Sequence, residues 1–482
     1  MKIILVVPPG GHLAVRWDEG SMPFLGLAYV AAALQKNGFE VEILDAFIER
    51  FDFDKTVEYL TFKKPEVIGF TFTTENRFDG FRLIKMVKEA LPGTATIAGG
   101  PHVSLAAEDT LSHLRELDYI VIGEGEKTFP ELVNCLAGAS KISEVRGLAY
   151  TKDGQVVVNP ARPFVQNLDE LPVPAWDLID FKKYNFFMEV PRAGKLPAAN
   201  LMTSRGCPFG CNFCSSSLMW GKIIRMHSAE RVLAEIKALV VKFGVRALWF
   251  FDDTFTIDRA RVKKICEMMI EEKLNLKWVA EIRVDTVDYE LLKLMKEAGC
   301  FMVGFGVESG SQRIIDEVIG KKIKVAQSFK VCEWCQQLGI ISNPFLILSH
   351  PGETEEDALK TKEFWERWPA GNPVSLAILH IYPGTRLEQL ARQRQILPPD
   401  FSWSVPDERI FTLSMVQGNV PIFLDKLSWP FLTELLADWA ASQHYPVWKK
   451  IPGVLRKIKN WDEFKKYISL GLGYLNRKSR RF

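Results

Sequence analysis

The chain has 482 residues, of which 47% are hydrophobic and 25% are charged. These values are ordinary for a globular protein and exclude a disordered or fibrous one. The length favours about three domains. Eight cysteines are too few for a disulfide scaffold of this size, so we expect a reducing cytoplasm. The first apolar run, Ile3–Val7, is too short for a signal peptide, and no apolar stretch reaches transmembrane length.

The net charge of +2 hides a basic C-terminal segment. Residues 446–482 contain eleven Lys or Arg and two acidic residues, which leaves the first 445 residues with a net charge of −7. Aromatic residues are interleaved with these bases: Trp448, Trp461, Phe464, Tyr467 and Tyr474. The pattern fits a segment that rests on an anionic membrane surface, and it equally fits a solvated helix whose aromatic side chains pack inward. The acidic remainder disfavours nucleic acid as a partner.

Residues 1–140 alternate short apolar runs with amphipathic helical patterns. The predicted strands are 3–7, 41–44, 67–72, 94–98 and 119–122, and the predicted helices are 25–37, 54–63, 78–91, 104–116 and 127–137. Five such units predict a doubly wound parallel sheet of the α/β class, whose ligand lies beyond the carboxyl ends of the strands.

The loops at those carboxyl ends are rich in glycine and small polar residues. They cover residues 8–12, 71–76, 99–104 and 123–126. Backbone can approach a large ligand closely at such positions. The first turn is not G-x-G-x-x-G, which disfavours a dinucleotide.

Residues 141–195 predict a connector, with a hairpin around Lys152-Asp153-Gly154 and a Pro-rich strap at 171–176. A second βα series fills residues 196–390 and predicts a partial barrel. Its strands are 198–203, 247–251, 277–282, 302–307, 343–348 and 375–380. Residues 391–482 are mainly helical in pattern and rich in Trp, and we expect part of this region to close the barrel mouth.

Three cysteines follow the first strand of this second series, as Cys207, Cys211 and Cys214. Reactive groups of parallel barrels occupy such strand ends. Three thiolates are one fewer than an iron–sulfur cluster needs, so one iron would stay open to a substrate or cofactor. A structural zinc site is the alternative, but the nearest further ligand, His227, lies beyond Trp220-Gly221-Lys222. Cys332 and Cys335 form another C-x-x-C, on a helical pattern that favours packing over metal binding.

These motifs, in this order, resemble the cobalamin-binding subgroup of the radical S-adenosylmethionine enzymes. The resemblance covers roughly residues 1–390. It implies that Cys207, Cys211 and Cys214 hold a [4Fe–4S] cluster whose open iron takes the amino and carboxylate groups of S-adenosylmethionine. Phe213 fits the aromatic residue that is usual before the last cysteine.

The resemblance extends to the strand ends of the barrel. Phe250–Thr256 resembles the segment near the methionine amino group, and residues 280–285 and 304–310 resemble those that face the ribose and carboxylate. The implied S-adenosylmethionine contacts are Asp252, Asp253, Glu281, Arg283, Glu308 and Ser309. For the turns Pro351-Gly352 and Pro383-Gly384 we prefer a structural role.

The N-terminal loops resemble the cobalamin-domain signatures of the subgroup. The implied cobalamin contacts are Gly10, His12, Thr73, Thr74, Glu75, Gly99, Gly100, Gly123, Glu124 and Gly125. The motif D-x-H-x-x-G, with which many cobalamin proteins ligate cobalt from below, is absent. His12 or residues 73–77 are therefore the candidates to face cobalt, and His102 is expected to be a satisfied loop residue.

The resemblance implies a methyltransferase. In the family, one-electron cleavage of S-adenosylmethionine yields a 5′-deoxyadenosyl radical that removes hydrogen from an unactivated carbon, and methylcobalamin then delivers the methyl group. An oxidative cyclase or rearrangement enzyme of the same subgroup, resembling the anaerobic magnesium-protoporphyrin ester cyclase, is the alternative. A cobalamin or iron–sulfur carrier without turnover is a third hypothesis, which the intact carboxylates disfavour. The expected partners are a small-molecule, lipid or tetrapyrrole substrate, an electron donor such as flavodoxin or ferredoxin, and a membrane surface for residues 446–482.

Overall fold

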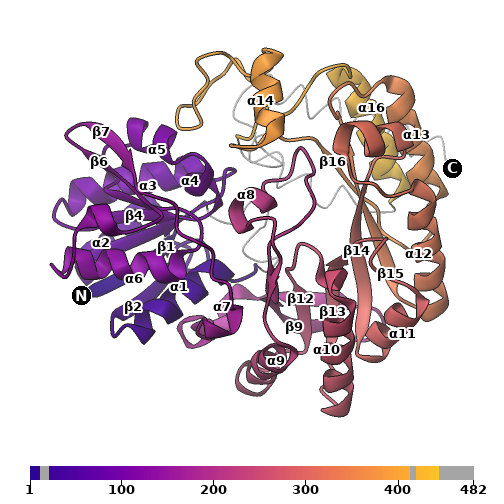
Figure 1. The fold of residues 1–482 in the computed structure, drawn as a ribbon, viewed down its shortest axis with the longest axis horizontal. Coiled ribbons are helices and arrows are strands. Elements are labelled where there is room, and N and C mark those ends of the chain that lie inside the picture. The colour runs from indigo at the N-terminus through magenta and orange to yellow at the C-terminus, as the bar shows by residue number, and fades with distance from the viewer. Residues whose placement is uncertain (11–20, 413–418, 444–482) are drawn as a thin grey trace.

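The structure is a computed structural model that describes residues 1–10, 21–412 and 419–443 (Figure 1). His12 and the basic segment 446–482 lie outside the described residues. Two seven-stranded sheets, each with helices packed on it, form the two main bodies of the molecule, and the C-terminal segment spans both (Figure 1).

The first sheet confirms the predicted doubly wound fold. Its strand order is β2-β1-β3-β4-β5-β6-β7, and β1 to β5 are parallel. The strands are β1 Lys2–Val7, β2 Glu40–Asp45, β3 Val67–Thr71, β4 Ala95–Gly99, β5 Tyr119–Val121, β6 Leu148–Lys152 and β7 Gln155–Val158. The helices are α1 Leu25–Lys36, α2 Phe53–Lys63, α3 Arg77–Ala90, α4 Pro101–Leu105, α5 Ala107–His113 and α6 Gly125–Leu136. The helix predicted over 104–116 is two helices, because the chain leaves helical geometry at Ala106.

The predicted hairpin is present as β6 and β7, and it extends the first sheet by pairing β6 antiparallel with β5. A short helical turn at Ile142–Glu144 precedes the hairpin, and the strap that follows it contains turns at Leu168–Glu170 and Trp176–Leu178, then α7 at Phe181–Tyr184. Val165, Leu168 and Leu171 form a small apolar cluster of their own.

The second sheet confirms the predicted partial barrel. Its order is β16-β15-β14-β13-β12-β9-β8, with β9 to β16 parallel and β8 antiparallel to β9. The strands are β8 Phe187–Val190, β9 Gly194–Leu201, β12 Ala247–Phe250, β13 Lys277–Ile282, β14 Cys300–Glu308, β15 Ile341–Leu348 and β16 Ser375–Ile378. Strand β9 begins earlier than predicted because its polar first half pairs with β8, which hydrophobic periodicity does not detect.

Helices cover the outer face of this sheet. They are α9 Ala229–Phe243, α10 Arg259–Glu271, α11 Tyr289–Glu297, α12 Val325–Leu338 and α13 Glu355–Arg367, with a π-helix at Ile314–Ile319 and a 3-10 turn at Phe255–Ile257. Polar caps fix where several of them begin: Ser228, Asp258 and Asp288 each accept a backbone N–H of the first helical turn. Each helix buries one apolar face against the strands, and this burial fixes which side of the helix faces the sheet.

The C-terminal segment includes α14 Arg386–Gln393 and α16 Trp429–Ser442. Between them lies an irregular stretch whose apolar residues pack around Leu379, Ile381 and Ala106. Ala106 belongs to the first body and Leu379 follows β16, so this stretch connects the two (Figure 1). Trp403 also lies in this cluster, where its indole N–H donates to Glu388 at 2.9 Å.

Candidate active site

The cysteine loop leaves the barrel through a two-residue strand and returns through another. Strand β10, Ser204–Arg205, pairs antiparallel with β11, Arg225–Met226, and the loop between them contains the short helix α8, Ser216–Trp220. Gly206 needs its positive φ of 100° here, and a Cβ at this position would lie 2.4 Å from the Ile223 carbonyl oxygen. The ribbon therefore closes the loop tightly at its base.

The three cysteines of this loop are half-buried, and none is in a disulfide. Burial raises the pKa of all three thiols, that of Cys214 to about 12. Their charges interact with one another and with Asp253, Lys321 and Arg283. A metal bound at this loop would have to displace these protons, because the thiolate is the metal ligand.

Across the described parts of the chain, no three His, Cys, Asp or Glu side chains converge on a single metal ion. A [4Fe–4S] cluster takes each thiolate on a different iron, so its ligands lie farther apart than those of one ion. Three thiols of one loop fit that donor set, whereas they do not form a compact tetrahedral zinc site. His227, the further zinc candidate, instead meets Asp169 through Nδ1 at 3.0 Å.

Asp252 and Asp253 follow β12 and have different environments. Asp252 is buried and accepts hydrogen bonds from the Thr203 backbone N–H at 3.2 Å, the Thr203 hydroxyl at 2.8 Å and the Ser204 hydroxyl. Asp253 accepts one from Ser216 in α8, and burial raises its pKa. Asp252 thus anchors the base of the cysteine loop, while Asp253 lies near Cys207 and Cys214. Their predicted contacts with the methionine ammonium stay predictions.

Glu281 lies on β13 with an unsatisfied carboxylate oxygen. Its Oε2 is buried and has no hydrogen-bond partner among the described residues, and burial raises its pKa to about 7. Gly304, on the adjacent strand β14, makes the space, because a Cβ there would lie 2.3 Å from Oε2. A buried acceptor without a donor needs a ligand or water, so this carboxylate fits a hydroxyl or amine of a bound cofactor.

Arg283 connects the end of β13 to the cysteine loop. Its guanidinium forms two hydrogen bonds with Asp285, at 2.9 and 2.8 Å, and lies 3.5 Å from the centre of the Phe209 ring. Phe209 stands between the first two cysteines in sequence. The contact orients the loop on the sheet by a cation–π interaction.

Glu308 ends β14 with a φ of 72°, a conformation that non-glycine residues rarely adopt. Its Oε1 forms a buried ion pair with Lys321 Nζ at 2.6 Å, and Lys321 also donates to the Gly306 carbonyl at 2.7 Å. Strained residues concentrate at functional sites. The lysine was not predicted as a site residue, and its charge also acts on Cys211.

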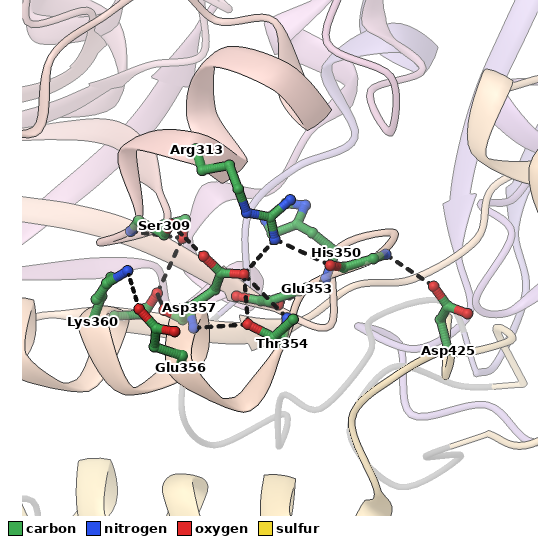
Figure 2. Close-up of polar contacts among 12 residues, drawn as sticks. Ser309, Arg313, His350, Glu353, Thr354, Glu356, Asp357, Lys360 and Asp425 are labelled. Carbon is green, nitrogen blue, oxygen red and sulfur yellow. Dashed lines mark hydrogen bonds and ion pairs between the residues drawn. The ribbon is translucent and has the colours of Figure 1, made fainter.

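Ser309 belongs to a polar network at the ends of β14 and β15 (Figure 2). Its hydroxyl interacts with that of Thr361 at 3.1 Å and accepts the Ser311 N–H at 3.1 Å. Nearby, Asp357 accepts hydrogen bonds from Ser311, Thr354 and Arg313 that hold its pKa well below the usual range, although burial acts in the opposite direction. Ser309 is thus hydrogen-bonded within the protein, and its predicted contact with S-adenosylmethionine stays a prediction.

His350 lies in the turn after β15 (Figure 2) and contacts Phe213 of the cysteine loop. Its ring centre lies 5.9 Å from that of Phe213. Both ring nitrogens are buried without a hydrogen-bond partner among the described residues, and burial lowers the pKa to about 4. Glu353 accepts the backbone N–H groups of Ser349 and His350, at 2.6 and 2.9 Å, so the Pro351-Gly352 turn has the structural role preferred above.

The loop after β3 faces the C-terminal part of the barrel. Glu75 accepts a hydrogen bond from the Tyr382 hydroxyl at 2.7 Å, and Arg77 donates to the carbonyls of Trp403 at 2.6 Å and Asn419 at 3.1 Å. Thr73 donates through its N–H to Asn76 at 2.8 Å. The carboxyl edge of the first sheet thereby lies against residues that follow β16.

In the described part of the chain, only one of the two ring nitrogens of His102 has a hydrogen-bond partner, so the expectation of a fully hydrogen-bonded loop residue was wrong. It lies in α4 rather than a loop, and Nδ1 interacts with the Thr74 hydroxyl at 3.2 Å. Nε2 is buried without a partner in the described residues. A large cofactor at this edge would give this nitrogen a partner. Space for such a cofactor is open at Gly123, where an added Cβ would meet nothing within 4 Å.

The remaining predicted cobalamin contacts differ in how closely neighbouring protein atoms already surround them. Gly99 ends β4 and Gly100 follows it, where a Cβ on Gly100 would lie 2.8 Å from the Thr71 hydroxyl. Gly10 is described and packs beside Asp79. Gly125 begins α6 against Val30. The Glu124 carboxylate accepts hydrogen bonds from Arg205, Arg225 and the Val165 N–H, so most of its acceptor capacity is used within the protein.

A doubly wound sheet whose ligand edge faces the cysteine loop of a partial barrel defines an enzyme that holds large cofactors between two α/β bodies. Residues 11–133 match the B12 binding domain, and residues 201–364 match the radical SAM superfamily. The chain is 37% identical over 397 residues to an uncharacterized methyltransferase of Pyrococcus horikoshii, covering 82% of this chain and 84% of that protein. The chain belongs to the cobalamin-binding radical S-adenosylmethionine enzymes.

Two further comparisons agree with this family. The anaerobic magnesium-protoporphyrin IX monomethyl ester cyclase of Rubrivivax gelatinosus is 29% identical over 372 residues, which are 76% of this chain and 66% of the cyclase. The methyltransferase TsrM of Kitasatospora setae, solved with tryptophan and a S-adenosylmethionine analogue, has the same fold, with a TM-score of 0.72 at 19% identity over 93% of this chain and 90% of that one. The cofactors of the chain are thus cobalamin, a [4Fe–4S] cluster and S-adenosylmethionine. Within the described residues, none of the helices combines the length and apolar character needed to cross a bilayer.

Several residues of this site had no sequence signal. Arg225, Lys321, His350 and Tyr382 are single polar residues outside any periodic pattern, and Arg225, His350 and Tyr382 each have a partner more than 100 residues away in sequence. Cys332 and Cys335 are both buried in the barrel core, and Cys332 accepts a hydrogen bond from Ser342 at 3.2 Å, which supports packing over ligation.

Proposed function

We propose that the chain methylates an sp3 carbon by radical chemistry. The observation that carries the proposal is the arrangement of the two bodies: the cysteine loop lies against the first sheet, at the edge where doubly wound folds bind ligands. When bound, the cluster and S-adenosylmethionine supply a hydrogen-abstracting radical and cobalamin supplies a methyl group. Each turnover then converts R–H, two S-adenosylmethionine and two electrons into R–CH3, S-adenosylhomocysteine, methionine and 5′-deoxyadenosine.

The chain's own residues would bind and orient the reactants. Cys207, Cys211 and Cys214 would hold three irons, and Asp253 and Glu281 would receive polar groups of S-adenosylmethionine. The loops at 73–77 and 99–102 and Gly123 would hold the corrin. The three cysteines and Glu281 are half-buried and Asp253 is exposed, so bound cofactors and substrate would have to complete the exclusion of water and competing hydrogen donors.

An anaerobic reaction with S-adenosylmethionine carrying a trideuterated methyl group tests this function. The protein, reconstituted with iron, sulfide and cobalamin, is incubated with a reductant and with lipid and tetrapyrrole probes. We expect a product 17 mass units heavier than its substrate, because CD3 replaces H, and one 5′-deoxyadenosine for each product. Formation of 5′-deoxyadenosine without label transfer to any probe contradicts methylation.

An oxidative cyclase is the second candidate, and the similarity to the Rubrivivax gelatinosus cyclase over 76% of this chain favours it. Magnesium-protoporphyrin monomethyl ester serves as its probe. A change of product mass without deuterium would favour the cyclase, and a deuterated product would favour the methyltransferase.

A reducing compartment and a low-potential donor such as flavodoxin or ferredoxin fit this chemistry, and all eight cysteines are free. The role of residues 446–482 at a membrane stays a prediction, which sedimentation with anionic liposomes, with and without that segment, would test.

A further inference from the structure

Two arginines stand opposite each other at the base of the cysteine loop. In the β10–β11 ribbon, Arg205 pairs with Arg225, and Arg205 lies two residues before Cys207. The Cys207 N–H donates to the Gly221 carbonyl at 3.2 Å, inside the same ribbon end. Any shift of the ribbon therefore moves the first cysteine with it.

Both guanidinium groups reach the first sheet. Arg205 donates to Glu124 Oε1 at 2.9 Å and to Glu126 Oε1 at 2.5 Å, and Arg225 donates to the same Glu124 oxygen at 2.6 Å. Glu124 precedes α6 and Glu126 lies in its first turn. These two carboxylates stand at the carboxyl end of β5, the edge assigned above to cobalamin.

The four side chains form a closed, neutral cluster that we call the neck clamp: Arg205, Arg225, Glu124 and Glu126. Each is at most 6% exposed. Arg205 also lies over the rings of Tyr29 and Trp220, each at 5.1 Å, and Arg225 donates to the Val165 carbonyl at 2.9 Å. Multiple directional bonds among buried charges hold one geometry, because any other leaves a charge unpaired.

We infer that the neck clamp sets the position of the cysteine loop relative to the cobalamin-binding edge, so that Glu124 and Glu126 are positioning residues rather than cofactor contacts. The inference rests on the proposed function, in which groups held by different bodies must meet at one carbon. Misplacement on the order of 1 Å costs such reactions roughly 100-fold in rate. The clamp joins the two bodies at the base of the loop that holds the cluster ligands.

The test compares Glu124→Gln with Glu131→Gln, both associated with α6. Glu131 pairs with Arg162, whose other hydrogen bonds go to Thr128 and the Arg146 carbonyl within the first body, so its variant is the matched control. In anaerobically reconstituted protein, iron content and bound cobalamin are measured first. The magnetic coupling between divalent cobalt and the reduced cluster is then measured by electron paramagnetic resonance, without substrate.

We expect Glu124→Gln to keep both cofactors, to change or broaden that coupling, and to lower methyl transfer by roughly 10- to 100-fold. Its ratio of 5′-deoxyadenosine to product should rise, and Glu131→Gln should match the unaltered protein in every measurement. Unchanged coupling in Glu124→Gln overturns the inference. Loss of cobalamin with unchanged iron also overturns it, because Glu124 would then be a cobalamin contact.

Arg225→Lys provides a second variant if Glu124→Gln does not fold. The lysine keeps the charge but cannot bridge Glu124, Val165 and Trp220 as the guanidinium does. An altered coupling with normal cofactor content supports the clamp, and an unaltered one contradicts it. Failure of the proposed methyl transfer would be seen separately, as absence of product from the unaltered protein, because the coupling needs no substrate.

Discussion

Replacement of Lys321 by Met tests how much the buried ion pair at the end of β14 stabilises the barrel. The Lys321 and Glu308 side chains are 8% and 9% exposed, and their charged atoms lie 2.6 Å apart. Lys321→Met leaves the Glu308 carboxylate buried without its cation. Loss of one partner from a buried pair costs about 3–5 kcal/mol.

That magnitude predicts a clear thermal effect. A unit of 150–250 residues, the size of the barrel, loses about 2–4 °C of melting temperature per kcal/mol, so Lys321→Met should melt roughly 10 °C lower. The measurement is urea and thermal unfolding of the apoprotein without oxygen, followed by circular dichroism. S-adenosylmethionine binding should weaken as well, since Glu308 is one of its predicted contacts.

Two further variants isolate the pair. Glu308→Gln combined with Lys321→Met should recover part of the loss, because neither charge is then buried alone. Lys324→Met is the matched control, since its pair with Asp316 is 67% and 38% exposed and should contribute less than about 1 kcal/mol. If the free energy of unfolding of Lys321→Met lies within about 1 kcal/mol of that of the unaltered protein, the ion pair does not stabilise the barrel.

Three other outcomes are expected. Cys214→Ala should lower the iron content and abolish 5′-deoxyadenosine formation, whereas Cys335→Ala should leave iron unchanged; equal iron loss in both would contradict the assignment of the cluster loop. Tyr382→Phe removes the hydrogen bond to Glu75 and should lower the free energy of unfolding by about 1–2 kcal/mol with cobalamin content retained, as measured by urea titration and absorbance; an unchanged free energy would show that this contact is neutral. Burial raises the pKa of Glu235 to about 7, so the folded state binds the proton more tightly and stability falls as the pH rises from about 4.5 through 7. At about pH 8, Glu235→Gln should then have a higher melting temperature than the unaltered protein, and at about pH 4 the two melting temperatures should be equal. The same difference in melting temperature at both pH values would refute this.

The succession of strands along the chain and the cysteine loop were predictable because they depend on local pattern. Apolar runs such as Ile3–Val7 identify fully buried parallel strands, and Cys207, Cys211 and Cys214 are close in sequence. The pairing of β6 with β5 was not predictable, since a hairpin's own sequence does not specify which sheet edge it joins.

The ionic contacts were less accessible to sequence reasoning. Glu124 stands in a glycine-rich loop that resembles a ligand site, yet its carboxylate meets arginines 81 and 101 residues later. Lys321 has no periodic context, and only the fold of β14 and the following loop brings it to Glu308. Tertiary contacts between single polar residues leave no local pattern.

The second sheet has a consequence for how the protein is made. From β9 to β16 its spatial order equals its order along the chain, so each strand can join the edge of a sheet that already exists. In the first sheet, by contrast, β1 needs both β2 and β3 as neighbours before it is covered. The barrel can therefore assemble progressively during synthesis, one strand and its following helix at a time. Its last strand, β16, and the residues that close the pocket emerge only after every predicted cluster ligand has been synthesised.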